Sequence, residues 1–82
     1  MNIDEKAHHA ARLLRDEALT LAIQEILESA TRVFLDAGGT PAAREQAHED
    51  VRAIATFRHR LTLWGDAKKI ADKKKDQHRG ND

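Results

Sequence analysis

The chain lacks several residue types on which common protein sites depend. Its 82 residues include no cysteine, no tyrosine, one proline and one tryptophan. Without cysteine, neither disulfides nor thiolate metal sites can form. No apolar run is long enough to cross a membrane, and the first residues, MNIDEKAHHAARLL, do not have the pattern of a signal peptide. We therefore expect one domain in the cytoplasm, with no membrane contact.

Charge is balanced in total but is distributed unevenly. The chain has 14 basic and 14 acidic residues. Residues 1–38 carry four Lys or Arg and seven Asp or Glu, a net charge of −3. Residues 67–82 carry six Lys or Arg and three Asp or Glu, a net charge of +3. The zero total argues against a dedicated nucleic-acid-binding domain. The two ends either attract each other, within one chain or between subunits, or are simply solvated.

The segment AGGTP at 37–41 is the strongest break between two helix-forming stretches. Gly38 is expected to close the first helix in the left-handed conformation. Thr40 is expected to cap the second helix, and Pro41 suits its first turn. No stretch alternates apolar and polar residues, with β-branched enrichment, as a strand does. The sequence predicts an all-α, antiparallel two-helix hairpin, with helices over about 3–37 and 41–64 and a turn at 38–40.

The first helix is predicted to begin at Asn2, which with Glu5 fits a capping pattern. Its apolar positions recur in steps of three and four, which is typical of an amphipathic helix. They are Ala7, Ala11, Leu14, Ala18, Leu21, Ala22, Ile26, Ala30 and Val33. The stripe is flanked by Leu19, Ile23, Leu27 and Phe34, which makes it wider than one partner helix covers. We therefore expect outer side chains to stay in water in a single copy, namely Leu13, Leu19, Ile23 and Leu27.

The second helix has a near-heptad apolar seam. Its members are Ala43, Ala47, Asp50, Ile54, Phe57, Leu61 and Trp64. Asp50 is the polar exception, and it either faces Arg or His of a partner helix or rotates outward. Gly65 either ends this helix near Trp64 or lies within a longer one. Residues 67–82 are predicted to form a basic tail, partly helical or disordered.

Two helices side by side would form a thin rod about 50 Å long. Such a rod has a small core, and dimerisation into a four-helix bundle is the simplest remedy. A ring of hairpins or a different protein partner would cover the same stripe. The predicted interface consists of Leu19, Ile23, Ile26, Leu27, Ile54, Phe57, Leu61 and Trp64.

No residue pattern indicates catalysis or a cofactor. Among five histidines, no two are four apart, and no HExxH occurs. We therefore expect no enzyme activity, no metal and no cofactor. A basic strip on the second helix and tail either contacts phosphates or pairs with the acidic first helix of a neighbouring subunit. The residues with possible phosphate contact are Arg52, Arg60, Lys68, Lys69, Lys73, Lys74 and Lys75.

Three segments carry a resemblance to a known group of proteins. They are AHHAARLLRDEAL at 7–19, the AGGTP break, and REQAHEDVRAIATFRHRL at 44–61. From about Ala7 to Ala71 the chain resembles small helical proteins encoded in the head-assembly regions of tailed bacteriophages, near portal and terminase genes. It is also similar to the oligomerising helices of small terminase subunits, without room for the helix-turn-helix domain that precedes them.

The resemblance implies a non-enzymatic phage structural or DNA-packaging accessory protein that acts by protein–protein contact. Its expected partners are a second copy of itself and phage portal or terminase proteins, in the cytoplasm of a bacterial host or in the virion. One alternative is a small nucleic-acid-binding protein that uses the basic strip. Another is a phage-encoded inhibitor of a host or defence protein.

Overall fold

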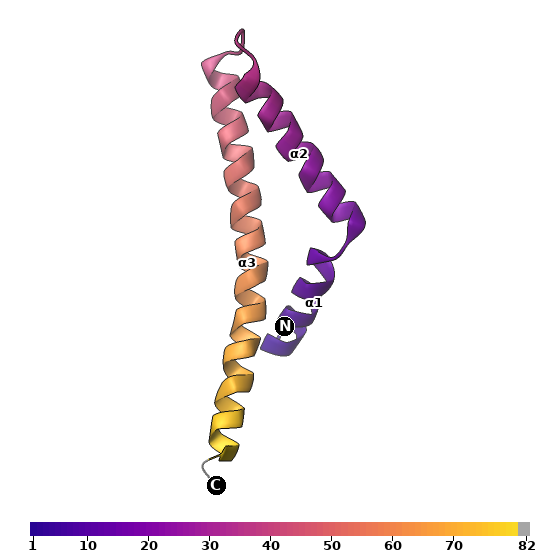
Figure 1. Ribbon diagram of the computed structural model, residues 1–82, viewed down its shortest axis with the longest axis vertical. Coiled ribbons are helices and arrows are strands. Elements are labelled where there is room, and N and C mark those ends of the chain that lie inside the picture. The colour runs from indigo at the N-terminus through magenta and orange to yellow at the C-terminus, as the bar shows by residue number, and fades with distance from the viewer. Residues whose placement is uncertain (81–82) are drawn as a thin grey trace.

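The computed structural model describes the backbone of residues 1–80 and the side chains of residues 1–77. It contains three helices, α1 (Ile3–Leu14), α2 (Glu17–Leu35) and α3 (Pro41–Gly80). Both α1 and α2 pack along α3, which forms the spine of the molecule (Figure 1). No strand occurs in residues 1–80, so the predicted all-α class is confirmed. Residues 81 and 82 of the predicted tail lie outside the described residues.

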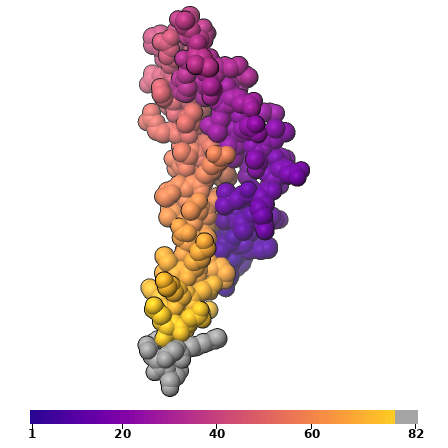
Figure 2. Space-filling view, in the orientation of Figure 1, coloured from indigo at the N-terminus to yellow at the C-terminus, as the bar shows by residue number. Residues whose placement is uncertain are grey.

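The molecule is an elongated rod. Its principal extents are 67 × 23 × 19 Å, and its radius of gyration is 18.5 Å. A compact chain of this length would have a radius of gyration of about 12 Å. Side chains fill the space between the helix ribbons, and the C-terminal end of α3 projects beyond α1 (Figure 2). Each helix therefore covers only one side of its neighbour.

The first helical stretch is broken at Arg15 and Asp16, so the single helix expected over 3–37 is wrong. The Arg15 and Asp16 amides donate to the carbonyls of Arg12 and Leu13, both at 3.2 Å, and close α1. Asp16 is extended, and its carboxylate accepts a hydrogen bond from the Leu19 amide at 2.8 Å. Aspartate is among the best helix N-caps because its side chain satisfies a free amide of the first turn. This local bond competes with continuation of the helix.

At its start, α1 is capped as the sequence predicts. The Asn2 side chain accepts a hydrogen bond from the Glu5 amide at 2.8 Å. Asp4 and Glu5 lie in the first turn, where the helix dipole favours negative charge. The predicted N-terminal cap is confirmed.

The turn between α2 and α3 is closed by Asp36 rather than by a left-handed glycine. The Asp36 carboxylate accepts from the Gly38 amide at 2.9 Å, and its carbonyl accepts from the Gly39 amide at 3.1 Å. No glycine of the described chain has a positive φ, so the left-handed conformation expected for Gly38 is wrong. The Thr40 hydroxyl accepts from the Ala43 amide at 3.1 Å, which confirms the predicted cap. An Asx turn thus replaces the glycine-dependent closure.

The third helix continues through Gly65 and runs for 40 residues to Gly80. Of the two possibilities that the sequence leaves open, the longer helix is the one observed. A Cβ atom built on Gly65 would have no neighbour within 4 Å, so no close contact requires a glycine here. Continuous helix through residues 67–80 also makes the predicted basic tail an extension of α3.

Alanines dominate the core. The buried apolar residues of the described chain are Ala7, Ala10, Ile23, Ala30, Ala47 and Leu61, and none of its large side chains is fully buried. Small side chains let the helices approach closely but bury little apolar area each. The break at Asp16 leaves a hollow of ≈ 140 Å³ under the corner between α1 and α2, lined by Leu13, Leu14, Leu19, Thr20, Ile23, Phe57, Arg58 and Leu61.

The inner face of the first two helices differs from the one expected. Ile23 is buried, and Leu13, Leu19 and Leu27 are half-buried, so the expectation that these four stay in water is wrong. Residues expected at the centre of the stripe are instead exposed, namely Ala11, Leu14, Ala18, Leu21, Ala22 and Ile26. An apolar stripe this wide permits several rotations of the helix, and packing against α3 selects one of them.

Candidate functional site

The eight predicted interface residues divide into a covered set and an open set. Ile23 and Leu61 are 8% and 4% exposed, so the contacts within one chain already cover them. Ile26 and Phe57 remain 43% and 41% exposed. The other four are half-buried along the edge of the helix seam: Leu19, Leu27, Ile54 and Trp64. Only the open and half-buried members are available to another molecule without unfolding.

A groove follows one side of the contact between α2 and α3. It consists of two adjoining hollows of ≈ 250 and ≈ 450 Å³, which share Ser29 and Asp50. Val33 and Ala43 line the first hollow, and Ile26 lines the second. We call this feature the α2–α3 groove. It is mainly apolar, it is open to solvent, and it runs along the helices, as does a surface that accepts another helix.

Asp50 lies in the middle of the α2–α3 groove. It is half-buried, and its carboxylate accepts a hydrogen bond from the Gln46 side-chain amide at 3.0 Å. In the described chain its carboxylate forms no ion pair with Arg or His. A half-buried carboxylate among apolar side chains is best stabilised by a cation or a further hydrogen-bond donor. The groove therefore has a half-buried carboxylate that a basic partner group would satisfy.

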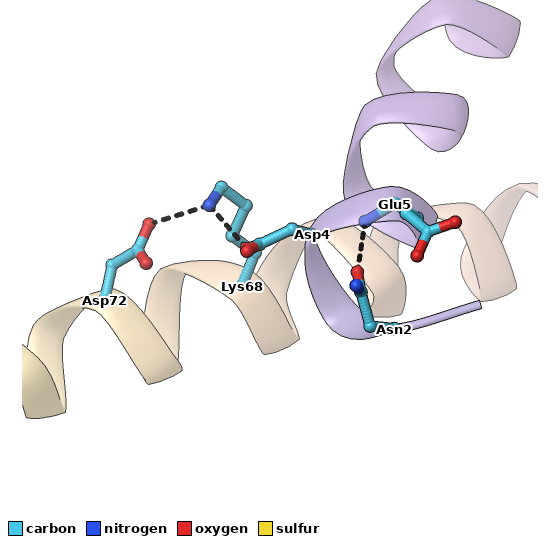
Figure 3. A network of polar contacts seen from close by, with 5 residues as sticks. All are labelled: Asn2, Asp4, Glu5, Lys68 and Asp72. Atoms are coloured by element: carbon cyan, nitrogen blue, oxygen red, sulfur yellow. Dashed lines mark hydrogen bonds and ion pairs between the residues drawn. The ribbon is translucent and has the colours of Figure 1, made fainter.

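The N-terminus of α1 is tied to α3 by a small charged network (Figure 3). The Lys68 ammonium lies 2.8 Å from the Asp4 carboxylate and 3.4 Å from that of Asp72. The hydrogen bond and charge of Lys68 lower the pKa of Asp4 below its ordinary value of 3.8. Asp4 and Asp72 raise the pKa of Lys68 above its ordinary value of 10.5. These groups are exposed, so solvent screens the network strongly.

Next to this network, the Lys6 ammonium lies 5.6 Å from the centre of the Trp64 ring. This distance is within the range of a cation–π contact. The sequence placed Lys68 in the basic strip and left open an attraction between the two ends within one chain, of which the Lys68–Asp4 pair is an example; Lys6 was given no role. The spacing of Lys68 and Asp72, four residues apart, was the available signal for the local pair, whereas the contacts to α1 depend on tertiary packing.

The basic strip does not form one face. Lys68 is paired, as described above, and the other lysines are exposed. Successive helix residues point about 100° apart, so Lys73, Lys74 and Lys75 surround α3 instead of sharing a side. Arg52 and Arg60 are exposed further up the same helix. The seven predicted phosphate-contact residues are therefore not gathered into one site.

Histidines and hydroxyl groups have local roles. His9 contacts the Arg12 guanidinium at 3.2 Å, and the His48 ring lies 4.6 Å from that of Phe34. The Thr31 and Thr62 hydroxyls donate to backbone carbonyls of their own helices. In the part of the chain that the structure describes, no group of three or more His, Asp or Glu residues is placed to hold a metal. Over the same residues, none of the helices combines the length and apolar character needed to span a membrane.

Comparison of the chain with protein-family models, with curated proteins and with solved structures gave no match.

Proposed function

We propose that this chain is a non-enzymatic assembly protein that acts through helix-mediated contacts with other protein chains. The observation that carries the proposal is the combination of a thin, alanine-rich core with large apolar side chains left open. Leu14, Ile26, Phe57 and Ile70 are each 41–57% exposed. A small domain with so little buried apolar area gains stability when a partner covers such side chains.

The setting we propose for this activity is the assembly of a tailed-bacteriophage head or the packaging of its DNA. The resemblance of residues 7–71 to small phage helical proteins supports this setting. A portal or terminase protein is the corresponding partner besides a second copy. The α2–α3 groove is the surface we assign to these contacts, because it is elongated, apolar and accessible.

The test compares two variants that place the same charge on different sides of α2. Ile26 lines the α2–α3 groove, whereas Leu21 is 56% exposed and is not part of the groove lining. We expect Ile26→Glu to reduce the mass in solution, measured by light scattering after size exclusion, and to reduce co-purification with portal or terminase. Leu21→Glu should leave both unchanged. If both variants associate as the unmodified chain does, the groove is not the contact surface.

A second candidate function is sequence-independent binding of nucleic acid. The C-terminal part of α3 favours it, because Lys69, Lys73, Lys74 and Lys75 are exposed there. Contacts of lysines with phosphates weaken steeply as salt rises, because counterions are released on binding. Replacing these four lysines by Gln should abolish binding of a short DNA duplex at low salt. Binding that is insensitive to salt would contradict this function.

A further inference from the structure

A second face of α3 lies beside the one that packs against α1 and α2. The covered face contains Ala47, Ile54 and Leu61, which are buried or half-buried. Residues three and four apart share one side of a helix. Steps of three and four residues also connect a neighbouring set of side chains on α3, which we call the α3 stripe. Its members are Ala43, Gln46, Asp50, Ala53, Phe57, Arg60, Trp64 and Ala67. No member of the α3 stripe is buried: Asp50 and Trp64 are half-buried, and the other six are exposed.

The α3 stripe is complementary to itself when it is read in the opposite direction. Its members form four pairs, each placed symmetrically about Ala55: Asp50 with Arg60, Ala53 with Phe57, Gln46 with Trp64, and Ala43 with Ala67. Opposite charges meet in one pair, and the two aromatic rings each meet a smaller side chain. A two-fold axis would repeat every pair. Alternating three- and four-residue steps are the spacing with which helices interlock in coiled coils.

Parallel alignment of two copies lacks this complementarity. In register, each residue would meet its own counterpart, so Asp50 would face Asp50 and Arg60 would face Arg60. Like charges placed opposite each other at an interface are unfavourable, particularly where one is half-buried. The charge pattern of the α3 stripe therefore selects the antiparallel direction.

The surroundings of the α3 stripe also fit a second copy of the chain in the antiparallel direction. Asp50 belongs both to the stripe and to the α2–α3 groove, whose lining also includes Glu25 and Ile26. An arginine brought into this groove would meet two carboxylates, and the partner helix would cover Ile26. The paired segment from Ala43 to Ala67 is about 36 Å long at 1.5 Å per residue.

The charged end of α3 is also complementary to a second copy in this orientation. In the antiparallel arrangement, residues 68–75 of one copy lie level with the turn between α2 and α3 of the other. This segment has five lysines and one aspartate. The turn contains Asp36, whose carboxylate would attract these lysines. The uneven charge along the rod thus favours the same direction.

We propose that a second copy of this chain docks in the α2–α3 groove with its α3 antiparallel, so that Asp50 of each copy faces Arg60 of the other. The inference rests on the proposed function and names the partner, its direction and its register. It also gives Asp50 a basic partner, which it lacks among the described residues of its own chain.

Exchange of the paired charges tests the register. Asp50→Arg alone and Arg60→Asp alone each create like-charged pairs, and we expect each to raise the dimer dissociation constant about tenfold or more. The double variant should restore the dissociation constant to near that of the unmodified chain. Asp66→Arg and Arg52→Asp make the same charge changes outside the α3 stripe and serve as controls. Sedimentation analysis measures association, and circular dichroism confirms that each variant stays helical. Failure of the double variant to restore association would overturn the register.

Single cysteines test the direction, since the chain has none of its own. Ala43→Cys and Ala67→Cys chains, mixed and oxidised, should form a mixed disulfide-linked dimer, whereas neither alone should cross-link. Self-cross-linking of Ala67→Cys would overturn the antiparallel direction but leave protein-mediated assembly intact. A monomeric chain at high concentration would overturn self-docking, and the co-purification experiment with portal or terminase would then decide the proposed function separately.

Discussion

Replacement of Gly65 by alanine tests the continuity of α3 and the packing around its middle. A glycine within a helix costs about 0.8–1.0 kcal/mol relative to alanine, because it loses more backbone freedom on folding. The Cβ of the new alanine would have no neighbour within 4 Å, so it would cause no clash to offset this gain. Gly65 also does not have a positive φ, so alanine would adopt its backbone conformation without strain.

We therefore expect Gly65→Ala to raise the free energy of unfolding by about 0.8–1.0 kcal/mol, which for a domain of this size raises Tm by about 4–8 °C. Thermal unfolding followed by circular dichroism measures the change, at one fixed protein concentration because association adds to stability. Gly39→Ala is the matched control. Its Cβ would lie 3.2 Å from the Asp36 carbonyl oxygen, and this crowding should remove any gain. Unchanged or lower stability in Gly65→Ala would refute a helix that continues through this residue.

Three further predictions concern the core, the helix break and the charged network. Leu61 is 4% exposed and Leu63 is 40% exposed. In urea unfolding, Leu61→Ala should therefore lower the free energy of unfolding by about 2–5 kcal/mol, and Leu63→Ala by about 1 kcal/mol or less. Equal losses would contradict the assigned inner face of α3. Asp16→Ala should cost about 1 kcal/mol in the same assay through loss of the α2 cap, and no loss would show that the cap does not stabilise α2. Because its pKa is lowered, Asp4 adds stability that is present above pH 3.8 and is lost as pH falls through the lowered pKa. Lys68 has a raised pKa, so it adds stability that is present below pH 10.5 and is lost as pH rises through the raised pKa. An NMR titration should place the pKa of Asp4 below 3.8 and nearer to 3.8 in Lys68→Gln, and identical values in both proteins would show that the ion pair does not form in solution.

The candidate surface was predictable only in part. Apolar side chains at helical spacing indicate a contact surface, which is why Ile26, Phe57 and Trp64 were predicted as interface residues. The structure leaves Ile26 and Phe57 exposed and Trp64 half-buried. Which of the predicted residues the chain covers by itself was not predictable. Ile23 and Leu61 belong to the same periodic pattern as Ile26 and Phe57, but they are buried within one chain. Periodicity identifies a face of a helix, whereas burial depends on what packs against it.

Local chemistry in the sequence determined the helices, the Asn2 cap, and the start of α3 at Thr40 and Pro41, because these depend on residues within one helical turn. The break at Asp16 was also encoded locally, by a capping residue followed by a helix-forming segment, but the continuous apolar pattern obscured it.

Only the tertiary structure decided the rotation of α1 and α2 against α3, and with it the exposure of Ile26 and the partial burial of Asp50. A wide apolar stripe has several nearly equivalent ways to face a neighbour. Close packing at buried alanines such as Ala10, Ala30 and Ala47 selects one of them, because packing density depends on the shapes of both surfaces together.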